Sequence, residues 1–178
     1  VFVGWEGSVS GTNPSTSFVV SGQPQVRAVF APLDYDSWTF NQINDNIFDP
    51  PASQRDDIDA DPDGDGFDNL FEYAFGGLPE SPDAPGIRPR VETAGDGELH
   101  FIFRRQMAAN DLVYRVRVST DLTTWNYNGD GTGQTYTEEL PNPSFNGNGT
   151  ETVTVRPLQQ PAPGRPVFLR LEVLHSPL

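Results

Sequence analysis

The sequence predicts a mainly β fold: an antiparallel sandwich or small barrel, an N-terminal β-hairpin segment, and a short helical segment that joins the two. Three observations support this prediction. Hydrophobic residues alternate with polar ones in several separate stretches, as expected for strands with one buried face. The 17 glycines and 17 prolines among 178 residues favour many turns and few long helices. The 12 Phe, 5 Tyr and 3 Trp residues supply large apolar side chains for a core.

Residues 1–33 are expected to form the N-terminal β segment. Hydrophobic residues recur at alternate positions in its first and last parts, and Gly, Ser, Thr, Asn and Pro residues lie between them. This arrangement is typical of hairpins. The residues that define it are Val1, Val3 and Trp5, then Phe18–Val20, then Val26, Ala28 and Phe30.

Residues 34–80 form an acidic segment in which two short helices are expected. The part from 34 to 66 contains ten aspartates and a single basic residue, Arg55. The first helix is predicted to begin at Ser37, as its N-cap, and to end before two consecutive prolines. The residues expected on its apolar face are Phe40, Ile43 and Ile47.

The second helix is predicted over residues 68–75, with Gly76 and Gly77 as its C-terminal stop. Residues 81–90 are rich in proline and are expected to be a linker. Residues 91–178 are expected to form the antiparallel β module, because their hydrophobic residues again alternate and their charged residues take the opposite phase. The apolar positions are Leu99, Phe101 and Phe103; Leu112, Tyr114, Val116 and Val118; Val153 and Val155; and Val167, Leu169, Leu171 and Val173.

Composition excludes several classes of function. The formal net charge of −14 argues against binding to nucleic acid or insertion into anionic membranes, since both favour a cationic surface. Without cysteine, disulfides cannot stabilise the fold, and a bound metal ion is one remaining means. No hydrophobic stretch has the length of a membrane span. The chain begins at Val1 and its one methionine is Met107, so we expect a processed or truncated part of a longer protein.

The most specific pattern lies at residues 61–72, which follow the calcium-loop pattern D-x-[DN]-x-[DN]-G-x5-E without a mismatch. Ca²⁺ takes about six to eight oxygen ligands, and alternate residues of a tight turn can direct their oxygens inward. Gly66 permits the sharp turn. No loop begins at Asp59, because Leu70 would then occupy the last ligand position. The predicted ligands are Asp61, Asp63, Asp65, the backbone carbonyl of Phe67, Asn69 directly or through water, and both carboxylate oxygens of Glu72.

We expect the ion in this loop to be structural. In an EF-hand sensor a helix runs directly into the loop, whereas the first predicted helix ends near Phe48, well before Asp61. Extracellular modules bind calcium at roughly 10⁻⁴–10⁻³ M, so the ion would stay bound at ambient calcium. The alternative is that the acidic run is a solvated linker, which is the usual role of such runs.

At this loop the sequence DPDGDGFDNLFEYAFG resembles the calcium-binding type 3 repeats of thrombospondin and the related bacterial DPDGDGxxNxxEYAxG segment. Such segments often lie near the C-terminal end of large secreted or surface proteins of bacteria. The stretches LHFIFRR, DLVYRVRVSTDLTTW, ETVTVRPL and PVFLRLEVL resemble the β-rich terminal module that commonly accompanies them. These resemblances imply a secreted protein at the bacterial cell surface.

The N-terminal sequence FVGWEGSVSGTNPSTSFVVSGQPQVRAVF is similar to the second half of an internalin-type B-repeat, with its F-x-G-W-x-G…A-x-F pattern. Only this half is present in the chain. The missing strands would leave an open sheet edge. We expect the C-terminal module or another strand, including one from a second chain, to complete it.

Known catalytic motifs are absent from the sequence. GSVSG at residues 7–11 has Val9 where a hydrolase elbow needs its serine. Acidic residues are numerous enough for a glycosidase pair, but the best-placed ones are assigned to the metal. His100 and His175 are expected at the surface. Trp125 is the best candidate to stack on a sugar, although a single Trp is more often a packing residue.

We therefore expect a non-catalytic C-terminal region of a secreted or surface bacterial protein, stabilised by a short helical calcium-binding segment and serving adhesion, display or extracellular assembly. Two alternatives stay open. One is a carbohydrate-binding module of a polysaccharide-degrading enzyme, which predicts an exposed aromatic platform near Trp125. The other is a subunit of an extracellular polymer completed by strand pairing between chains. The expected partners are a second copy, a cell-surface or matrix component, or a glycan.

Overall fold

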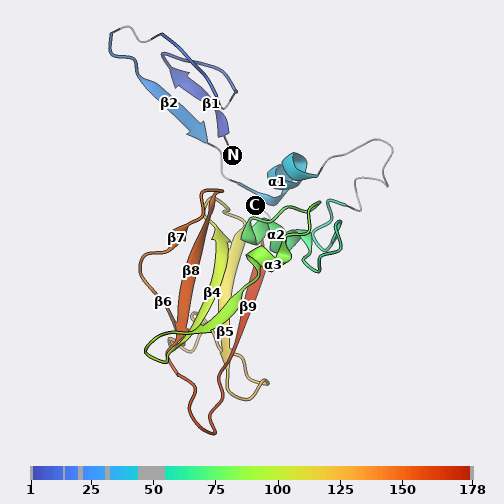
Figure 1. Ribbon diagram of the computed structural model, residues 1–178, viewed down its shortest axis with the longest axis vertical. Helices are drawn as coiled ribbons and strands as arrows, with labels where there is room; N and C mark the ends of the chain where they lie inside the picture. Colours follow the sequence, from blue (N-terminus) through green and yellow to red (C-terminus); the bar gives the residue numbers. More distant parts are fainter. Residues whose placement is uncertain (1, 14, 20–21, 31–32, 44–54, 177–178) are drawn as a thin grey trace.

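The computed structural model describes residues 2–13, 15–19, 22–30, 33–43 and 55–176. The protein is mainly β and its paired strands are antiparallel, which confirms the predicted fold class (Figure 1). The strands of the described residues form open sheets rather than a closed barrel, so the sandwich is the better of the two predicted architectures. No helix in this part of the chain is long and apolar enough to cross a membrane.

The larger sheet contains the strands β3 (Arg90–Thr93), β4 (Leu99–Gln106), β8 (Thr150–Pro157) and β6 (Thr137–Glu139), in the order β3-β4-β8-β6. The short strand β7 (Ser144–Phe145) also pairs with β8. The connections before β6 and between β7 and β8 contain several glycines. Their glycines allow the positive φ angles that tight turns need.

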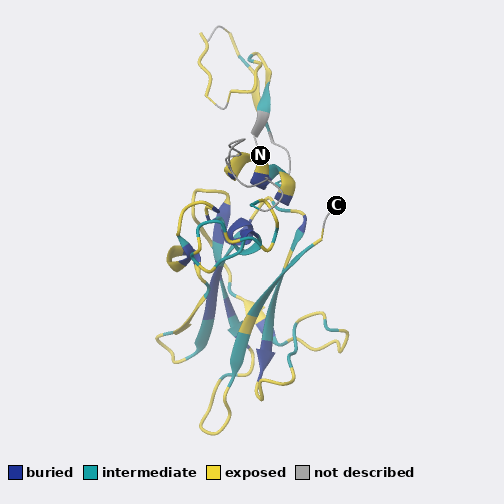
Figure 2. Ribbon diagram, turned by 90° about the vertical axis from the view of Figure 1, so that its right-hand side faces the viewer, coloured by how far each residue is buried: buried dark blue, intermediate teal, exposed yellow. Residues whose placement is uncertain are grey.

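The second sheet consists of β5 (Leu112–Ser119) and β9 (Phe168–His175), paired along their whole length. Its inward phase faces the larger sheet, and these two faces together make the core (Figure 2). Arg117 lies on the outward phase and pairs with Glu172 of the neighbouring strand at 2.7 Å. The alternation predicted from sequence therefore corresponds to one buried and one solvated face. The core residues are Phe101, Phe103, Val153 and Val155, packed against Tyr114, Val116, Leu169 and Leu171.

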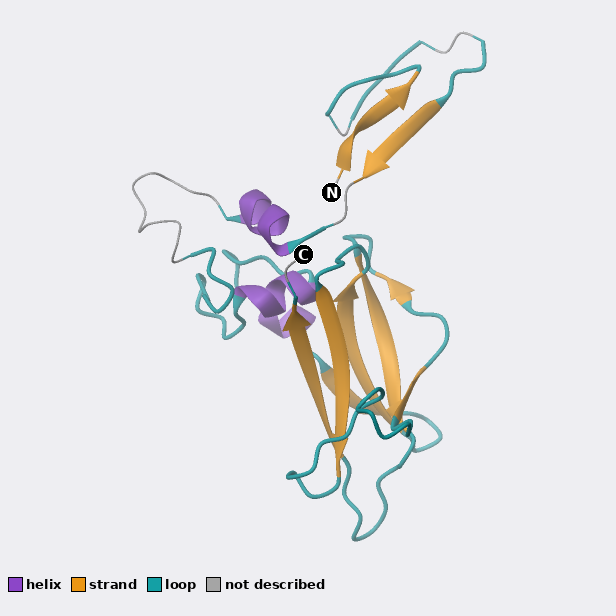
Figure 3. Ribbon diagram, turned by 180° about the vertical axis from the view of Figure 1, so that it is seen from behind, coloured by secondary structure: helices purple, strands orange, loops and turns teal. Residues whose placement is uncertain are grey.

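Helix α2 (Asn69–Phe75) closes one end of the sandwich, where the helices gather (Figure 3). Asp68 caps its N-terminus by accepting a hydrogen bond from the Phe71 N–H, and Gly76 ends it in the left-handed conformation at φ 73°. Both boundaries agree with the prediction. Phe75 is fully buried and packs against residues of both β5 and β9, among them Tyr114 and Leu171.

The proline-rich segment expected to be a linker is packed against the body of the protein. It contains the short helix α3 (Ala84–Ile87), whose Ala84 and Ile87 are both buried. Ile87 belongs to the same cluster as Phe75. The prediction of a linker over residues 81–90 is thus wrong here. The prolines interrupt the alternation of apolar and polar residues that indicates a strand, but the apolar side chains of Ala84 and Ile87 are still buried against the rest of the protein.

Helix α1 (Tyr35–Gln42) begins before the predicted cap. Its N-cap is Asp34, which accepts a hydrogen bond from the Ser37 N–H at 2.8 Å, and Ser37 lies inside the helix. The buried side chains are Tyr35 and Trp38, which cluster with Tyr73 of α2. Phe40, predicted to face inward, is 87% exposed, whereas Ile43 is buried as expected. The predicted position Ile47 and the two prolines at 50 and 51 lie outside the described residues.

The N-terminal hairpin consists of β1 (Phe2–Gly7) and β2 (Val26–Phe30), and Figure 1 shows it apart from the sandwich. Within the described residues this sheet has two strands, extended only by an isolated bridge between Trp5 and Gly11. Phe18 and Val19, in the middle part of the expected alternation, are exposed and belong to no strand, and Val20 lies outside the described residues.

His175 is more enclosed than predicted. Its Nε2 lies 3.2 Å from Oδ2 of the buried Asp111, and its ring contacts Tyr35. The same carboxylate accepts hydrogen bonds from the Tyr35 N–H at 2.8 Å and the Tyr73 hydroxyl at 2.7 Å. This network joins the end of β9 to both α1 and α2.

Replacing Phe75 by Ala should destabilise the protein by about 3–5 kcal/mol, because it leaves a cavity between α2 and the β5–β9 sheet. Urea unfolding provides the measurement. Phe40→Ala is the matched control, and its effect should stay within about 0.5 kcal/mol, since this side chain lies in solvent. Equal effects of the two changes would contradict the packing described for α1 and α2.

Candidate metal centre

Backbone hydrogen bonds bring the two ends of the acidic loop together. The N–H groups of Asn69 and Leu70 donate to the carbonyls of Ala60 at 2.8 Å and Ile58 at 3.1 Å. The Asn69 side chain, which is fully buried, donates from Nδ2 to the carbonyls of Arg55 at 2.7 Å and Asp57 at 2.8 Å. The entrance of the loop is therefore fixed to the first turn of α2.

The aspartates of the loop turn their side chains back onto its own backbone. Asp61 accepts from the N–H groups of Gly64 and Gly66, at 2.9 and 3.1 Å. Asp63 accepts from the Asp65 N–H, and Asp65 accepts from the Phe67 N–H, both at 3.0 Å. Gly66 has φ 92°, a conformation that favours glycine, which agrees with its predicted role in the sharp turn.

Glu72 is the most unusual residue of this region. Its side chain lies on α2, it is fully buried, and neither of its carboxylate oxygens has a hydrogen-bond partner. Burying a carboxylate without a partner costs several kcal/mol or more, so buried charges are almost always paired or bound to a metal. The pairing group expected for Glu72 is a cation.

Carboxylate oxygens converge around Glu72 in two groups, in each of which they lie within 4.8 Å of one another. The first group is Asp61, Asp63 and Asp65, and the second is Asp65, Glu72 and Asp83. Four of these five residues were predicted from the loop pattern. Asp83 was missed because it lies outside the loop, in the segment expected to be a linker, where no spacing rule singles it out.

The negative charges of this region disfavour one another's ionisation. Burial, followed by the charges of Asp63, Asp65 and Asp83, raises the pKa of Glu72 to about 8. Burial also raises the pKa of Asp63 and of Asp83, with nearby aspartates adding to the effect. Two unit charges about 5 Å apart repel by about 3 kcal/mol at an effective dielectric constant of about 20. A bound cation would reverse this repulsion.

The donor set fits a hard cation. The two groups offer only carboxylate oxygens, which Ca²⁺, Mg²⁺ and Mn²⁺ prefer, and neither contains histidine. Four buried carboxylate oxygens, one on Asp63, two on Glu72 and one on Asp83, have no hydrogen-bond partner, as expected for atoms that could bind an ion. These acidic groups could therefore hold a metal ion.

Two of the predicted ligands have other contacts. The Asn69 amide nitrogen holds the loop entrance, while its Oδ1 is buried without a hydrogen-bond partner. The ring of Phe67 packs against Phe71 and Phe75, with the Arg88 guanidinium 5.1 Å from its centroid. Ligation through the Phe67 carbonyl and through Asn69 stays a prediction.

Trp125, the candidate sugar-stacking residue, makes contacts within the chain. The guanidinium of Arg170 lies over its ring at 4.7 Å, and its indole N–H donates to the Leu122 carbonyl at 3.2 Å. Tyr127 is stacked in the same way by Arg115 and Arg117. These rings cover the outer face of the β5–β9 sheet, so the contacts of Trp125 support a packing role.

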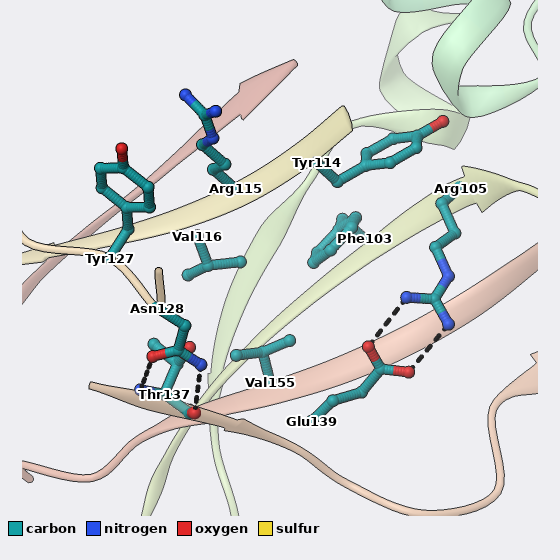
Figure 4. A pocket seen from close by; sticks show the side chains of 10 residues that line it. All are labelled: Phe103, Arg105, Tyr114, Arg115, Val116, Tyr127, Asn128, Thr137, Glu139 and Val155. Atoms are coloured by element: carbon teal, nitrogen blue, oxygen red, sulfur yellow. Dashed lines mark hydrogen bonds and ion pairs between the residues drawn. The ribbon is translucent and has the colours of Figure 1, made fainter. Parts of the chain in front are cut away.

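A cavity of about 170 Å³ lies between the two sheets, beside β5 and β6 (Figure 4). Phe103, Val116 and Val155 form its apolar side. Its polar residues are paired within the chain: Arg105 makes two hydrogen bonds to Glu139, at 2.8 and 2.9 Å, and Asn128 donates to the Thr137 carbonyl. The cavity is smaller than common ligand sites, which measure about 300–1,000 Å³.

Stability of the metal-free protein should fall as pH rises from about 5 to about 8. The pKa of Glu72 is raised from 4.5 when unfolded to about 8 when folded, so the folded state binds more protons across this window. The stabilisation is complete below the unfolded pKa and is lost as pH passes through the folded one. Urea unfolding in chelator at several pH values would measure the slope.

Glu72→Gln removes the titrating group and should flatten this slope. Glu92→Gln, at an exposed position of β3, is the matched control and should leave it unchanged. A metal-free protein whose stability is constant or increases between these pH values would contradict the burial of an unpaired Glu72 carboxyl group.

Comparisons of the chain with models of known protein families, with curated proteins and with solved structures give no significant match. The assignment of function therefore depends on the residues of the chain and on the geometry of this centre.

Proposed function

We propose that this protein binds Ca²⁺ through the acidic loop and α2, and that the ion stabilises the junction between the helical segment and the sandwich. The observation that carries the proposal is the fully buried Glu72, whose two carboxylate oxygens lack hydrogen-bond partners and which lies among other acids. The loop sequence supports it, because residues 61–72 match the calcium-loop pattern at every ligand position.

Calcium suits these residues better than magnesium. Ca²⁺ accepts about six to eight oxygen ligands in flexible geometry, whereas Mg²⁺ requires near-ideal octahedral geometry and usually keeps several waters. The candidate ligands of the loop range from the exposed Asp61 to the fully buried Glu72, and the buried part of this site favours replacing the hydration shell with protein oxygens. When bound, the ion supplies positive charge that offsets the repulsion among these acids.

The wider role that we propose is non-catalytic: a C-terminal region of a secreted or surface bacterial protein that serves adhesion, display or assembly outside the cell. A net charge of −14 and the absence of cysteine fit a protein that takes up calcium for stability and does not use disulfides. The resemblance of the loop to segments of secreted bacterial proteins supports the same location. Extracellular calcium would keep a site of modest affinity filled.

Calcium should stabilise the protein against unfolding. At free calcium between about one and ten times Kd, the linkage gain is about 0.4–1.4 kcal/mol, and it increases with further calcium. Thermal unfolding in chelator and at several calcium concentrations measures this gain. If calcium leaves the unfolding temperature unchanged at millimolar concentration, the proposed function is wrong.

The variant Glu72→Gln separates metal binding from general effects of charge. In chelator it should be at least as stable as the wild type, since it removes an unpaired buried carboxylate. In calcium it should gain much less than the wild type, so the order of the two proteins reverses. Glu92→Gln, the exposed control, should respond to calcium as the wild type does.

A second candidate function, extracellular assembly, is favoured by the N-terminal hairpin. A two-stranded sheet is marginally stable by itself, and among the described residues no third strand completes β1 and β2. A strand from a neighbouring copy would supply the missing backbone partners.

Assembly should appear as an increase of molar mass with protein concentration. Light scattering coupled to size exclusion, with calcium present, measures it. A strictly monomeric protein over the whole soluble range would contradict pairing between copies and leave calcium-dependent stability as the function.

A further inference from the structure

We propose that Asp83 is a ligand of the same ion, so that one divalent cation joins three separate parts of the chain: the acidic loop, α2, and the segment that leads into α3. This inference rests on the proposed function, because it concerns the ligands of the calcium site. The ion would then bind more than the loop: it would also hold the segment at residues 81–90, which the sequence predicts to be a linker.

The position of the Asp83 side chain is the first argument. It lies within the group formed with Asp65 and Glu72, and its Oδ1 is buried without a hydrogen-bond partner. Asp83 occupies the N-cap of α3 but makes no side-chain capping bond, although acids at this position usually accept one. Its carboxylate thus lies with those of Asp65 and Glu72 and does not cap the helix.

A shared proton would be the alternative means of holding Glu72 and Asp83 together. Two carboxyl groups that share a proton are joined by a short hydrogen bond between their oxygens. Both oxygens of Glu72 and Oδ1 of Asp83 lack any hydrogen-bond partner. One oxygen of each residue also lies within 4.8 Å of an oxygen of Asp65. A cation among these three carboxylates would remove the need for a shared proton.

Asp65 connects the loop to the same segment. Its Oδ1 accepts from the Phe67 N–H inside the loop, and its Oδ2 accepts from the Ala84 N–H, at 2.6 Å, at the start of α3. Asp65 also belongs to both carboxylate groups. The backbone beside Asp83 is consequently held by a residue that the loop pattern places at a calcium ligand position.

Gly77 allows Asp83 to approach. A Cβ atom on Gly77 would lie 3.1 Å from Asp83 Oδ1, 2.6 Å from Ile87 Cδ1 and 3.3 Å from the Glu72 Cα. A side chain at residue 77 would therefore crowd Ile87 most closely and would also press on Asp83, beside Glu72. Gly77 also leaves space for Ile87, and the burial of Ile87 against Phe75 attaches α3 to the sandwich.

The test measures calcium affinity by isothermal titration calorimetry for the wild type, Asp83→Asn and Asp59→Asn. Asp83→Asn removes one charged ligand and should weaken calcium binding at least about tenfold, because affinity depends on the number of charged ligands. Asp59→Asn is the matched control: it removes one negative charge from an exposed residue beside the loop and should change affinity much less.

Hydrogen exchange of the wild type gives an independent measurement that needs no variant. Calcium should slow amide exchange both in the loop and in residues 77–88. Weakened binding in Asp83→Asn but not in Asp59→Asn, together with this added protection, supports the inference.

If the wild type binds calcium but Asp83→Asn binds it as tightly, or calcium protects the loop and leaves residues 77–88 unchanged, Asp83 is not a ligand and the proposed function stands. If the wild type binds no calcium, the proposed function fails, and this inference fails with it.

Discussion

The burial of the Glu72 carboxyl group on α2 is the constraint on which the rest of this structure depends. Glu72 is followed by Tyr73, Ala74 and Phe75, and all four residues are fully buried. Asn69 of the same helix is also buried, and its other two residues, Leu70 and Phe71, are half-buried, so Glu72 does not lie on a solvated face. The packing of Phe75 against the β5–β9 sheet thus fixes Glu72 in the interior, and the surrounding acids make a cation the compensating group that we propose.

The remaining segments converge on the same helix. Tyr73 joins α1 through Tyr35 and Trp38 and reaches Asp111 beside β5, while Ile87 of α3 packs on Phe75. Removing the ion would leave these apolar contacts in place but restore repulsion among the acids. The ion is therefore expected to set the order and stability of the junction, while the sandwich keeps its own core of residues from β4, β5, β8 and β9.

Sequence patterns predicted the parts of the fold that depend on local periodicity and local chemistry. The alternation of β4, β5 and β9 and the Gly76 stop of α2 follow from such rules. The patterns failed where a tertiary contact decides the outcome. Asp34 rather than Ser37 caps α1, Phe40 faces solvent, and the proline-rich segment is buried through Ala84 and Ile87. The sequence could not predict Asp83 as a member of the acidic group for the same reason, because only the packing of α3 brings it beside Glu72.

The most direct test of the central claim is a crystal structure grown in calcium, with the ion identified from its anomalous scattering. If calcium binds as proposed, a single strong peak lies about 2.3–2.6 Å from the carboxylate oxygens of Glu72 and from those of Asp65. A structure in calcium without such a peak, in which the Glu72 carboxyl group instead hydrogen-bonds to a protein group or water, would contradict it.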